Sequence, residues 1–465
     1  MGMYKRLGKN IIFQFIGNFS SKLLTFFLVP LYTSVMSTEE YGIADYINVT
    51  INLLYPILTL VIVEAEVRFA LDPKEDKKQI FTFSNIIGIL AIVLGLALAP
   101  LLTLNLIIKE WYLYFIIGLI SWILYEIMLH FALGLDRVST ASAAGVINTF
   151  TTIIFTIISL VILDLGVSGY LLSSALGNVV ASGYIFIHEK YYTFYTSVRQ
   201  IENNLKKRML KYSIPMLPNS IAWWVNNSVD KYMVEFFYGA STMALLSVAY
   251  RIPSILTTVI SIFVSAWRLS SVDKFGSEEN KIFFRNIYKL FNLILSLTTI
   301  VCLIFTKELA GFLFQEDFFE AWTIVPFLLV AYIFQGESTF LGSVFTADKK
   351  TNVLFVSTII GSFVNVVLNY FLIPAYSNDG AAFATLCGYF VICLIRYVYA
   401  LKIIPLGVHM RDEGITIIII IFLAAVSYLT FWMRLVIGIT GIISIVLIQR
   451  KAFMFMIDNL KRFIK

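Results

Sequence analysis

The sequence has little charge, few cysteines and no recognisable catalytic motif. Only 14% of its 465 residues are charged, whereas soluble chains carry about a quarter. The three cysteines, Cys302, Cys387 and Cys393, all lie in apolar stretches, which predicts neither a disulfide framework nor a metal site. The chain has no P-loop, so we do not expect it to hydrolyse ATP. Its loops are too short for a soluble catalytic domain. We therefore expect a protein that is not an enzyme.

The chain contains many long apolar runs. Hydrophobic residues make up 59% of the chain, and about twenty consecutive apolar residues suffice to cross a bilayer as a helix. Windows of this kind occur near 10–35, 41–67, 80–104, 111–135, 141–163, 168–188, 212–237, 243–270, 282–306, 321–346, 351–373, 379–403, 414–432 and 434–449. The pattern predicts an all-α integral membrane protein with about fourteen transmembrane helices.

Basic residues are distributed unevenly over the loops, and this sets the expected orientation. They gather in alternate loops, as at 206–208, whereas the opposite loops contain only Lys109, Lys307 and Arg434. Because basic loops stay in the cytoplasm, we expect both termini there. The same distribution accounts for the net charge of +6 without a nucleic-acid partner.

A hydrophilic segment near 189–211 divides the windows into two sets of six. Each set opens with a basic cluster and a polar first span, followed by a short loop that contains Ser-Thr. This repetition predicts an internal duplication, the usual build of secondary transporters. The predicted parts are an N-lobe of six spans at 1–189, a cytoplasmic linker at 190–211, a C-lobe of six spans at 212–405, two extra spans at 406–450 and a cytoplasmic amphipathic tail at 451–465.

Polar side chains form helical stripes inside several spans. Lys22 lies roughly 18 Å from the start of its window, close to the bilayer midplane, and Asn18 lies one turn away. An ionisable group at this depth is costly and by default faces a cavity or a helix bundle. The candidate cavity residues are Lys22, Asn18, Asp45, Asn226, Asn227, Asp230, Arg251, Glu337 and Arg396.

These stripes have a second interpretation, because polar groups in spans often only hold helices together. Lys22 and Asp230 lie in the first span of each half, and Asp45 and Arg251 lie in the second. Such opposite charges could face each other and close one side of a cavity. Lys22 could equally pair with Asp45 or Asp230 as a structural contact.

Three buried acids are candidates to bind a coupling ion, either H⁺ or Na⁺: Asp230, Glu337 and Glu126. Glu126 lies one turn from His130, so the pair is either a proton relay or a structural hydrogen bond. We expect no other cofactor.

Two motifs resemble the bacterial polysaccharide flippase family (Wzx-type), which belongs to the multidrug/oligosaccharidyl-lipid/polysaccharide exporter superfamily. The first is the run at 212–224, which begins Tyr212-Ser213-Ile214-Pro215-Met216 and is followed by Asn226-Asn227-Ser228-Val229-Asp230-Lys231-Tyr232. The second is Pro30-Leu31-Tyr32-Thr33 with Ser37-Thr38-Glu39-Glu40-Tyr41-Gly42. The six-plus-six-plus-two arrangement of spans is also similar to that family.

The resemblance implies two six-helix lobes around a central cavity in the bacterial inner membrane. It also implies alternating access that carries an undecaprenyl-diphosphate-linked oligosaccharide from the inner to the outer leaflet. Cations such as Lys22, Arg251 and Arg396 suit the diphosphate. Membrane lipids, a polysaccharide polymerase and glycosyltransferases are the expected partners.

Three other functions remain open at this point. A cation-coupled multidrug antiporter of the same superfamily would favour an acidic cavity, and the mixed charges here argue against it. A peptidoglycan lipid II flippase would differ only in the sugar that it carries. A membrane polymerase or ligase would need a larger outer loop.

Overall fold

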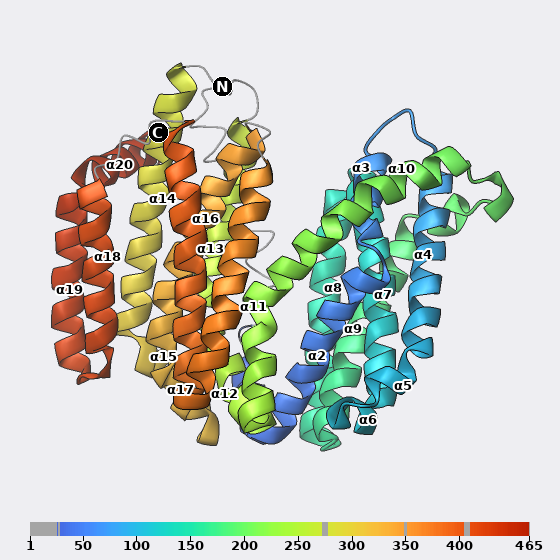
Figure 1. Cartoon of the computed structure of the whole chain (residues 1–465), viewed down its shortest axis with the longest axis horizontal. Coiled ribbons are helices and arrows are strands. Elements are labelled where there is room, and N and C mark those ends of the chain that lie inside the picture. The colour runs from blue at the N-terminus through green and yellow to red at the C-terminus, as the bar shows by residue number, and fades with distance from the viewer. Residues whose placement is uncertain (1–25, 27, 272–277, 348–350, 404–409, 465) are drawn as a thin grey trace. The chain divides into compact units, whose positions relative to one another are not determined.

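The computed structural model of the chain describes residues 26, 28–271, 278–347, 351–403 and 410–464, and no β-strand occurs among them (Figure 1). Contacts divide the described residues into two compact units, those up to Ser228 (the N-unit) and those from Val229 onward (the C-unit), and this boundary in the sequence falls within helix α11. Among the described residues, eight helices are long and apolar enough to cross a membrane, or up to ten if two bent pairs each form one span. The predicted all-α membrane fold is confirmed, and the count of about fourteen spans stays a prediction.

Helix α7 lies at the centre of the N-unit and contacts α2, α3, α4, α8 and α9. The helices of this unit are α2 (Thr38–Leu58), α3 (Ile62–Ala70), α4 (Lys77–Ala97), α5 (Ala99–Leu102), α6 (Leu106–Glu110), α7 (Tyr112–Gly134), α8 (Val138–Thr156), α9 (Gly166–His188), α10 (Asn203–Ser213) and the first part of α11 (Leu217–Tyr238). The apolar window at 111–135 therefore predicted α7 to within one residue at each end.

Helices α2 and α3 form a bent span. Ser37 begins α2 with a capping box, in which its side chain accepts from the Glu40 backbone N–H and the Glu40 carboxylate accepts from the Ser37 N–H. The helix ends after Pro56, and Leu60 and Val61 follow with φ of 53° and 55°. Residues with a Cβ rarely adopt this left-handed conformation. The helix axis turns by 60° here, so the single window predicted at 41–67 contains a sharp bend.

The basic segment predicted as a linker contains α10, and an ion pair fastens this helix to the loop before α4. The Arg208 guanidinium donates two hydrogen bonds to the Glu75 carboxylate, at 2.5 and 3.0 Å. These hydrogen bonds raise the pKa of Arg208 above its ordinary value. The boundaries of the predicted lobes stay a prediction.

The C-unit contains the second part of α11 and a long hairpin, α17, that packs on α16. Its helices are α12 (Ala240–Ala249), α13 (Ser254–Ser271), α14 (Glu278–Ile304), α15 (Thr306–Leu313), α16 (Val325–Ala347), α17 (Thr351–Leu401), α18 (Met410–Ala425), α19 (Phe431–Ile448) and α20 (Arg450–Ile464). Helix α17 is broken at Ser377, where φ is 51° and ψ is −130°. The two spans predicted at 351–373 and 379–403 thus lie on either side of this residue.

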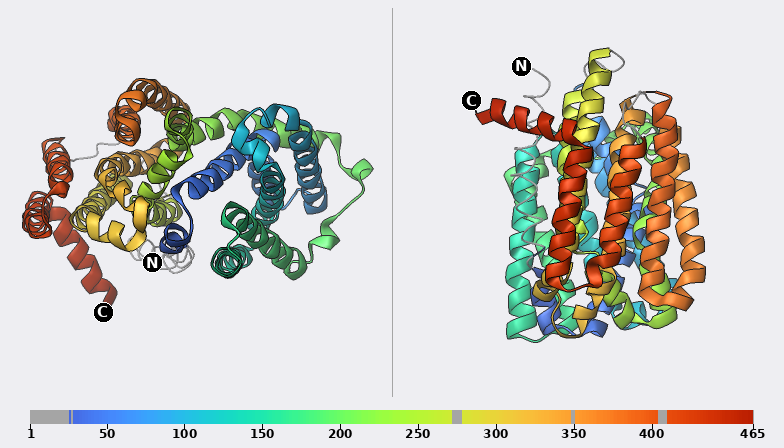
Figure 2. Two further views of the ribbon diagram at one scale, coloured as in Figure 1. Left: turned by 90° about the horizontal axis from the view of Figure 1, so that it is seen from below. Right: turned by 90° about the vertical axis from the view of Figure 1, so that its left-hand side faces the viewer.

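Helices α18 and α19 pair with each other and pack on α14, and α20 turns away from the direction of α19 (Figure 2). Arg434 of α19, only 3% exposed, joins α19 to the end of α14 and the start of α15. Its guanidinium donates to the Ile304 carbonyl at 2.8 Å and to both Glu308 carboxylate oxygens at 2.6 and 3.1 Å.

Candidate functional site

The richest buried polar group in the C-unit surrounds Asp230. We call it the Asp230 cluster, and it comprises Asp230 of α11, Tyr250 after α12, and Asn365, Asn369 and Thr385 of α17. The Tyr250 hydroxyl and the Thr385 hydroxyl both donate to Oδ2 of Asp230, the second at 3.5 Å. The Asn365 amide donates to the Thr385 hydroxyl at 3.4 Å, and the Asn369 amide donates to Asn365 Oδ1 at 3.1 Å.

Four residues of the cluster are buried, and Tyr250 is half-buried. Asp230 is 2% exposed, Thr385 2%, Asn365 1% and Asn369 0%. The backbone N–H of Lys231 donates to the second oxygen of Asp230, Oδ1, at 2.9 Å, and the Lys231 ammonium lies 5.9 Å from the centre of the Tyr250 ring. A carboxylate this deeply buried needs several partners to remain ionised, and the cluster supplies neutral donors from three helical elements.

Bends in the helices bring these residues together. The span formed by α12 and α13 bends by 44° at the segment that contains Tyr250, Arg251 and Pro253. Asn365 and Asn369 lie one turn apart, so they share one face of the first half of α17. Thr385 reaches the same place because α17 doubles back at Ser377.

The donor set of the cluster suits a small hard cation or a proton. It offers a carboxylate, amide oxygens and a hydroxyl, which are the ligands that such cations prefer. Oδ1 of Asn369 is buried and has no hydrogen-bond partner within the described part of the chain. Among the same residues, no group of three histidine, cysteine or acidic side chains could hold a metal ion. One acid surrounded by neutral oxygens is compatible with a monovalent coupling ion.

Glu337 and Arg396 lie on the seam between α16 and α17. The Cys393 thiol donates to Oε2 of Glu337 at 3.4 Å. Arg396, 3% exposed, donates to three acceptors of the protein itself. These are the hydroxyls of Ser357 and Thr358 at 3.0 and 2.9 Å and the backbone carbonyl of Ser338 at 2.8 Å. The guanidinium is therefore held between the two helices.

A row of aromatic rings extends from the Asp230 cluster towards this seam. The ring centres of Tyr250 and Tyr332 are 6.2 Å apart, as are those of Tyr332 and Tyr389. The Gln335 amide then donates to the Tyr389 hydroxyl at 3.3 Å. These contacts connect the Asp230 cluster with Gln335 of α16, the helix that also carries Glu337.

The remaining predicted residues are dispersed. Lys22 and Asn18 lie outside the described residues. Arg251 is half-buried at the bend between α12 and α13. Asp45 in α2 and Asn226 in α11 are buried in the N-unit, at 7% and 4% exposure.

Two further predicted residues have local contacts in the N-unit. Asn227 is exposed, and its amide donates to the Trp223 carbonyl at 2.6 Å. Glu126 approaches His130, with 3.4 Å between Oε2 and Nδ1, and its backbone carbonyl lies 2.9 Å from the same nitrogen. The two side chains are therefore close together, and their role, a structural hydrogen bond or a proton relay, stays a prediction.

Sequence reasoning missed three residues that the structure singles out, two beside Asp230 and one in the N-unit. Tyr250 and Thr385 contact Asp230 from 20 and 155 residues away, a distance over which a single sequence carries no pairing signal. Glu66 of α3 is 0% exposed, and both of its carboxylate oxygens lack a hydrogen-bond partner among the described residues. Its position at the end of the window at 41–67 gave no signal that the carboxylate is buried.

Comparison with known proteins identifies the family. The family described as "Polysaccharide biosynthesis protein" matches residues 7–268, more than half of the chain. The chain belongs to this family. The family described as MatE also matches residues 215–371 of this polysaccharide biosynthesis protein. The resemblance predicted from the two motifs is thus confirmed.

Two curated proteins are similar to this family member in sequence. The capsular polysaccharide biosynthesis protein CapF of Staphylococcus aureus is 25% identical over 216 residues, which cover 45% of this chain and 54% of CapF. The match therefore spans about half the length of that relative. An uncharacterized membrane protein of Methanocaldococcus jannaschii, MJ1375, is 22% identical over 418 residues, which cover 85% of this chain and 98% of that protein.

Solved structures of membrane transporters share the fold. The lipid II flippase MurJ, in an inward closed conformation, matches with a TM-score of 0.74 and 17% identity, covering 95% of this chain and 100% of MurJ. An outward-facing multidrug resistance MATE transporter matches with a TM-score of 0.63 and 16% identity, covering 88% of this chain and 98% of that one. The family member is accordingly a multi-pass membrane protein with the fold of these transporters.

Proposed function

We propose that this polysaccharide biosynthesis protein is a flippase. It moves an oligosaccharide linked to undecaprenyl diphosphate from the inner to the outer leaflet by alternating access. The observation that carries the proposal is the family match over residues 7–268, in a chain whose fold is that of membrane transporters. The chemistry is consistent, because a glycan and its anionic diphosphate need a polar route through about 30 Å of hydrocarbon.

The Asp230 cluster is the site that we propose for the coupling ion, H⁺ or Na⁺. Asp230 is only 2% exposed and lies beside a bent span and a broken helical hairpin. Such irregular helices commonly bind coupling ions in transporters. Glu337 and Glu126 are the alternative sites. Two described cations lie beside the cluster, Lys231 next to Asp230 and Arg251 at the bend next to Tyr250.

The proposed setting is the inner membrane of a bacterial cell, with both termini in the cytoplasm. Glycosyltransferases would supply the lipid-linked oligosaccharide, and a polymerase or ligase on the other side would consume it. These enzymes are the proposed functional partners, and the surrounding lipids accommodate the polyprenyl tail.

A gene deletion tests the proposal. We expect the deletion strain to lose surface polysaccharide and to accumulate lipid-linked oligosaccharide on the cytoplasmic leaflet, as measured by enzymatic accessibility in sealed inverted and right-side-out vesicles. Complementation with the wild-type gene should reverse both effects. Normal surface polysaccharide in a deletion strain without a second flippase would refute the proposal.

The same strain distinguishes the two related functions. Rescue of a strain depleted of its lipid II flippase would favour peptidoglycan precursor transport, a possibility raised by the fold shared with MurJ. Greater sensitivity of the deletion strain to cationic drugs, with unchanged polysaccharide, would favour an antiporter. We expect neither result.

A further inference from the structure

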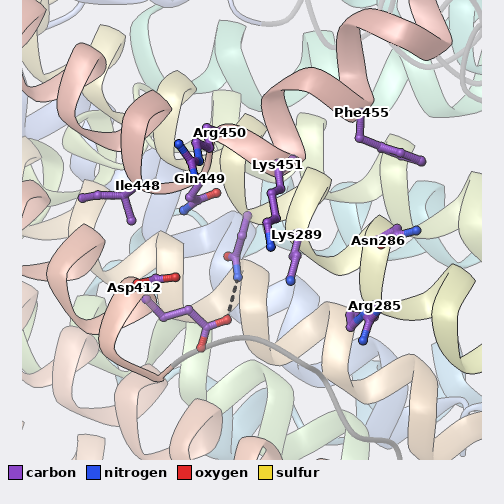
Figure 3. Close-up of a pocket in the computed structure, with 12 residues that line it drawn as sticks. Arg285, Asn286, Lys289, Asp412, Ile448, Gln449, Arg450, Lys451 and Phe455 are labelled. Carbon is purple, nitrogen blue, oxygen red and sulfur yellow. Dashed lines mark hydrogen bonds between the residues drawn. The ribbon is translucent and has the colours of Figure 1, made fainter.

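A polar pocket lies at one end of the C-unit, away from the Asp230 cluster. It has a volume of about 450 Å³ and lies between α14, the start of α18 and the corner at which α19 meets α20 (Figure 3). We call it the α14–α20 pocket. Its size falls in the range of small-molecule sites, and neither the predicted cavity residues nor the coupling acids line it.

The pocket is lined by more positive than negative charge. Arg285 and Lys289 of α14 face Arg450 and Lys451 at the start of α20, against the two acids Asp412 and Glu413. Arg285 and Lys289 lie one helical turn apart, a spacing at which like charges repel. The Lys289 ammonium is also within electrostatic range of both Arg285 and Lys451. Figure 3 shows Lys289 and Lys451 extending into the same space.

The two acids offset only part of this positive charge, because they lie within electrostatic range of Lys289 but the four basic residues outnumber them. Within the described part of the chain, none of the four basic residues forms an ion pair, and the buried Nε of Arg285 has no hydrogen-bond partner. The two acids also have other interactions. Oε1 of Glu413 accepts from the Asn292 amide at 3.4 Å, and Asp412 lies in the first turn of α18, where the helix dipole favours a carboxylate.

The walls of the pocket are held in place by direct contacts between helices. The Gln449 amide, at the corner between α19 and α20, donates to the Thr416 hydroxyl of α18 at 3.3 Å. The Thr416 hydroxyl in turn donates to the Asp412 carbonyl at 2.9 Å. The corner that carries Arg450 and Lys451 is thereby fixed against the start of α18.

The pocket lies at the end of an exposed apolar surface. Helices α18 and α19 expose Ile418 at 66%, Phe422 at 56%, Val436 at 62% and Leu447 at 66%. Helix α20 leaves α19 at this end (Figure 2), with Met454 57% exposed on it. Alkyl chains on α18 and α19 would place a lipid headgroup at the mouth of the pocket. Basic pockets between transmembrane helices are known to accept such headgroups.

We propose that the α14–α20 pocket binds the phosphate of an anionic membrane phospholipid, with the alkyl chains on the exposed faces of α18 and α19. Arg285, Lys289 and Lys451 hold the phosphate, and Asn286 and Gln449 are the neutral polar groups nearest to the glycerol. The bound lipid neutralises the excess positive charge and secures α20 to the helix pair. This role is independent of the molecule that the protein transports.

Lipid binding to the purified full-length protein tests the proposal. Native mass spectrometry would measure the affinities for phosphatidylglycerol and for phosphatidylcholine with the same acyl chains. We expect phosphatidylglycerol to bind more tightly, and K289Q and K451Q each to weaken it about tenfold, since each removes one charge-assisted contact. Each substitution should weaken the binding of phosphatidylcholine less, because its choline cation already offsets the charge of its phosphate. Lys451 is exposed, so K451Q keeps the test valid even if K289Q fails to fold.

Controls separate this site from general surface charge and from a soluble anion. Lys402, an exposed lysine after α17 and outside the pocket, provides the matched substitution K402Q, which should leave both affinities unchanged. Equal loss in K402Q, or equal affinity for the two lipids, would overturn the proposal. Displacement of phosphatidylglycerol by millimolar inorganic phosphate would identify a site for free phosphate and would also overturn it.

Discussion

At the scale of single residues, burial separates the acids that can respond to an ion from those that merely face water. Asp230 is enclosed by Tyr250, Thr385 and the two asparagines of α17, whereas Asp317, in the same unit, is exposed. The two aspartates therefore form a matched pair for substitution by asparagine.

We expect D230N to abolish most of the stimulation of transport by a cation gradient. Loss of one charged ligand should weaken ion binding about ten- to a hundredfold. The measurement is transport in proteoliposomes with imposed H⁺ or Na⁺ gradients, with D317N as the control. Full gradient-driven transport by D230N would indicate that the coupling ion binds at Glu337 or Glu126 instead.

Arg396 offers a second test at this scale, because the protein itself occupies three of its donors. Lysine cannot replace the planar guanidinium at Ser338, Ser357 and Thr358 together. We expect R396K to destabilise the protein by about 1–3 kcal/mol, measured by thermal unfolding in detergent. The exposed Arg199 gives the control R199K, which should be neutral. Loss of transport with unchanged stability would instead indicate that the Arg396 guanidinium contacts the substrate.

At the scale of helices, the close approach of two backbone segments limits which residues can replace glycine in the turn of α17. A Cβ at Gly380 would lie 2.4 Å from the Leu372 carbonyl oxygen and 3.1 Å from the Ile373 nitrogen, and neither can move like a side chain. We expect G380A to destabilise the protein by about 1–3 kcal/mol. At Gly183 of α9 a Cβ would meet nothing within 4 Å. G183A should therefore be neutral or stabilising, by up to about 1 kcal/mol. Thermal unfolding of both variants would measure these two changes in stability.

The helices themselves were largely predictable, and their breaks were not. The apolar windows at 168–188 and 321–346 correspond to α9 (Gly166–His188) and α16 (Val325–Ala347), because the length of an apolar run reflects the bilayer. The left-handed residues Leu60 and Val61 are branched and apolar, so nothing in their composition indicates a turn. Helices α2 and α3 both pack on α4 and α7, and such contacts between distant segments are not encoded locally in a single sequence.

At the scale of the whole molecule, the sequence predicted the buried acids better than their surroundings. A deep charge such as Asp230 is conspicuous in an apolar run, whereas Thr385 looks like any small polar residue in a span. Its contact with Asp230 depends on the reversal of the chain at Ser377. The family could be recognised from the motif at 212–224, since that motif is local.

Orientation in the membrane is the prediction that belongs to the whole chain. With the three native cysteines replaced, we expect a cysteine at Ser197 to react with an impermeant maleimide only after the cells are opened. A cysteine at Asp317 should react in intact cells. Both positions are exposed, so access depends on the side of the membrane. The reverse pattern would invert the proposed topology.

Two hydrogen bonds hold the turn of α17 near Ser377 in place, and they limit where a label can be inserted into this protein. The Tyr238 hydroxyl donates to the Pro374 carbonyl at 2.9 Å, and the Asn378 amide donates to the Thr242 carbonyl, also at 2.9 Å. The tip of the hairpin is thus attached to the end of α11 and the start of α12. An epitope tag or fluorescent protein inserted there would break both attachments and disturb the helix that carries Asp230. The exposed stretch at 197–200 is the better place for such a label.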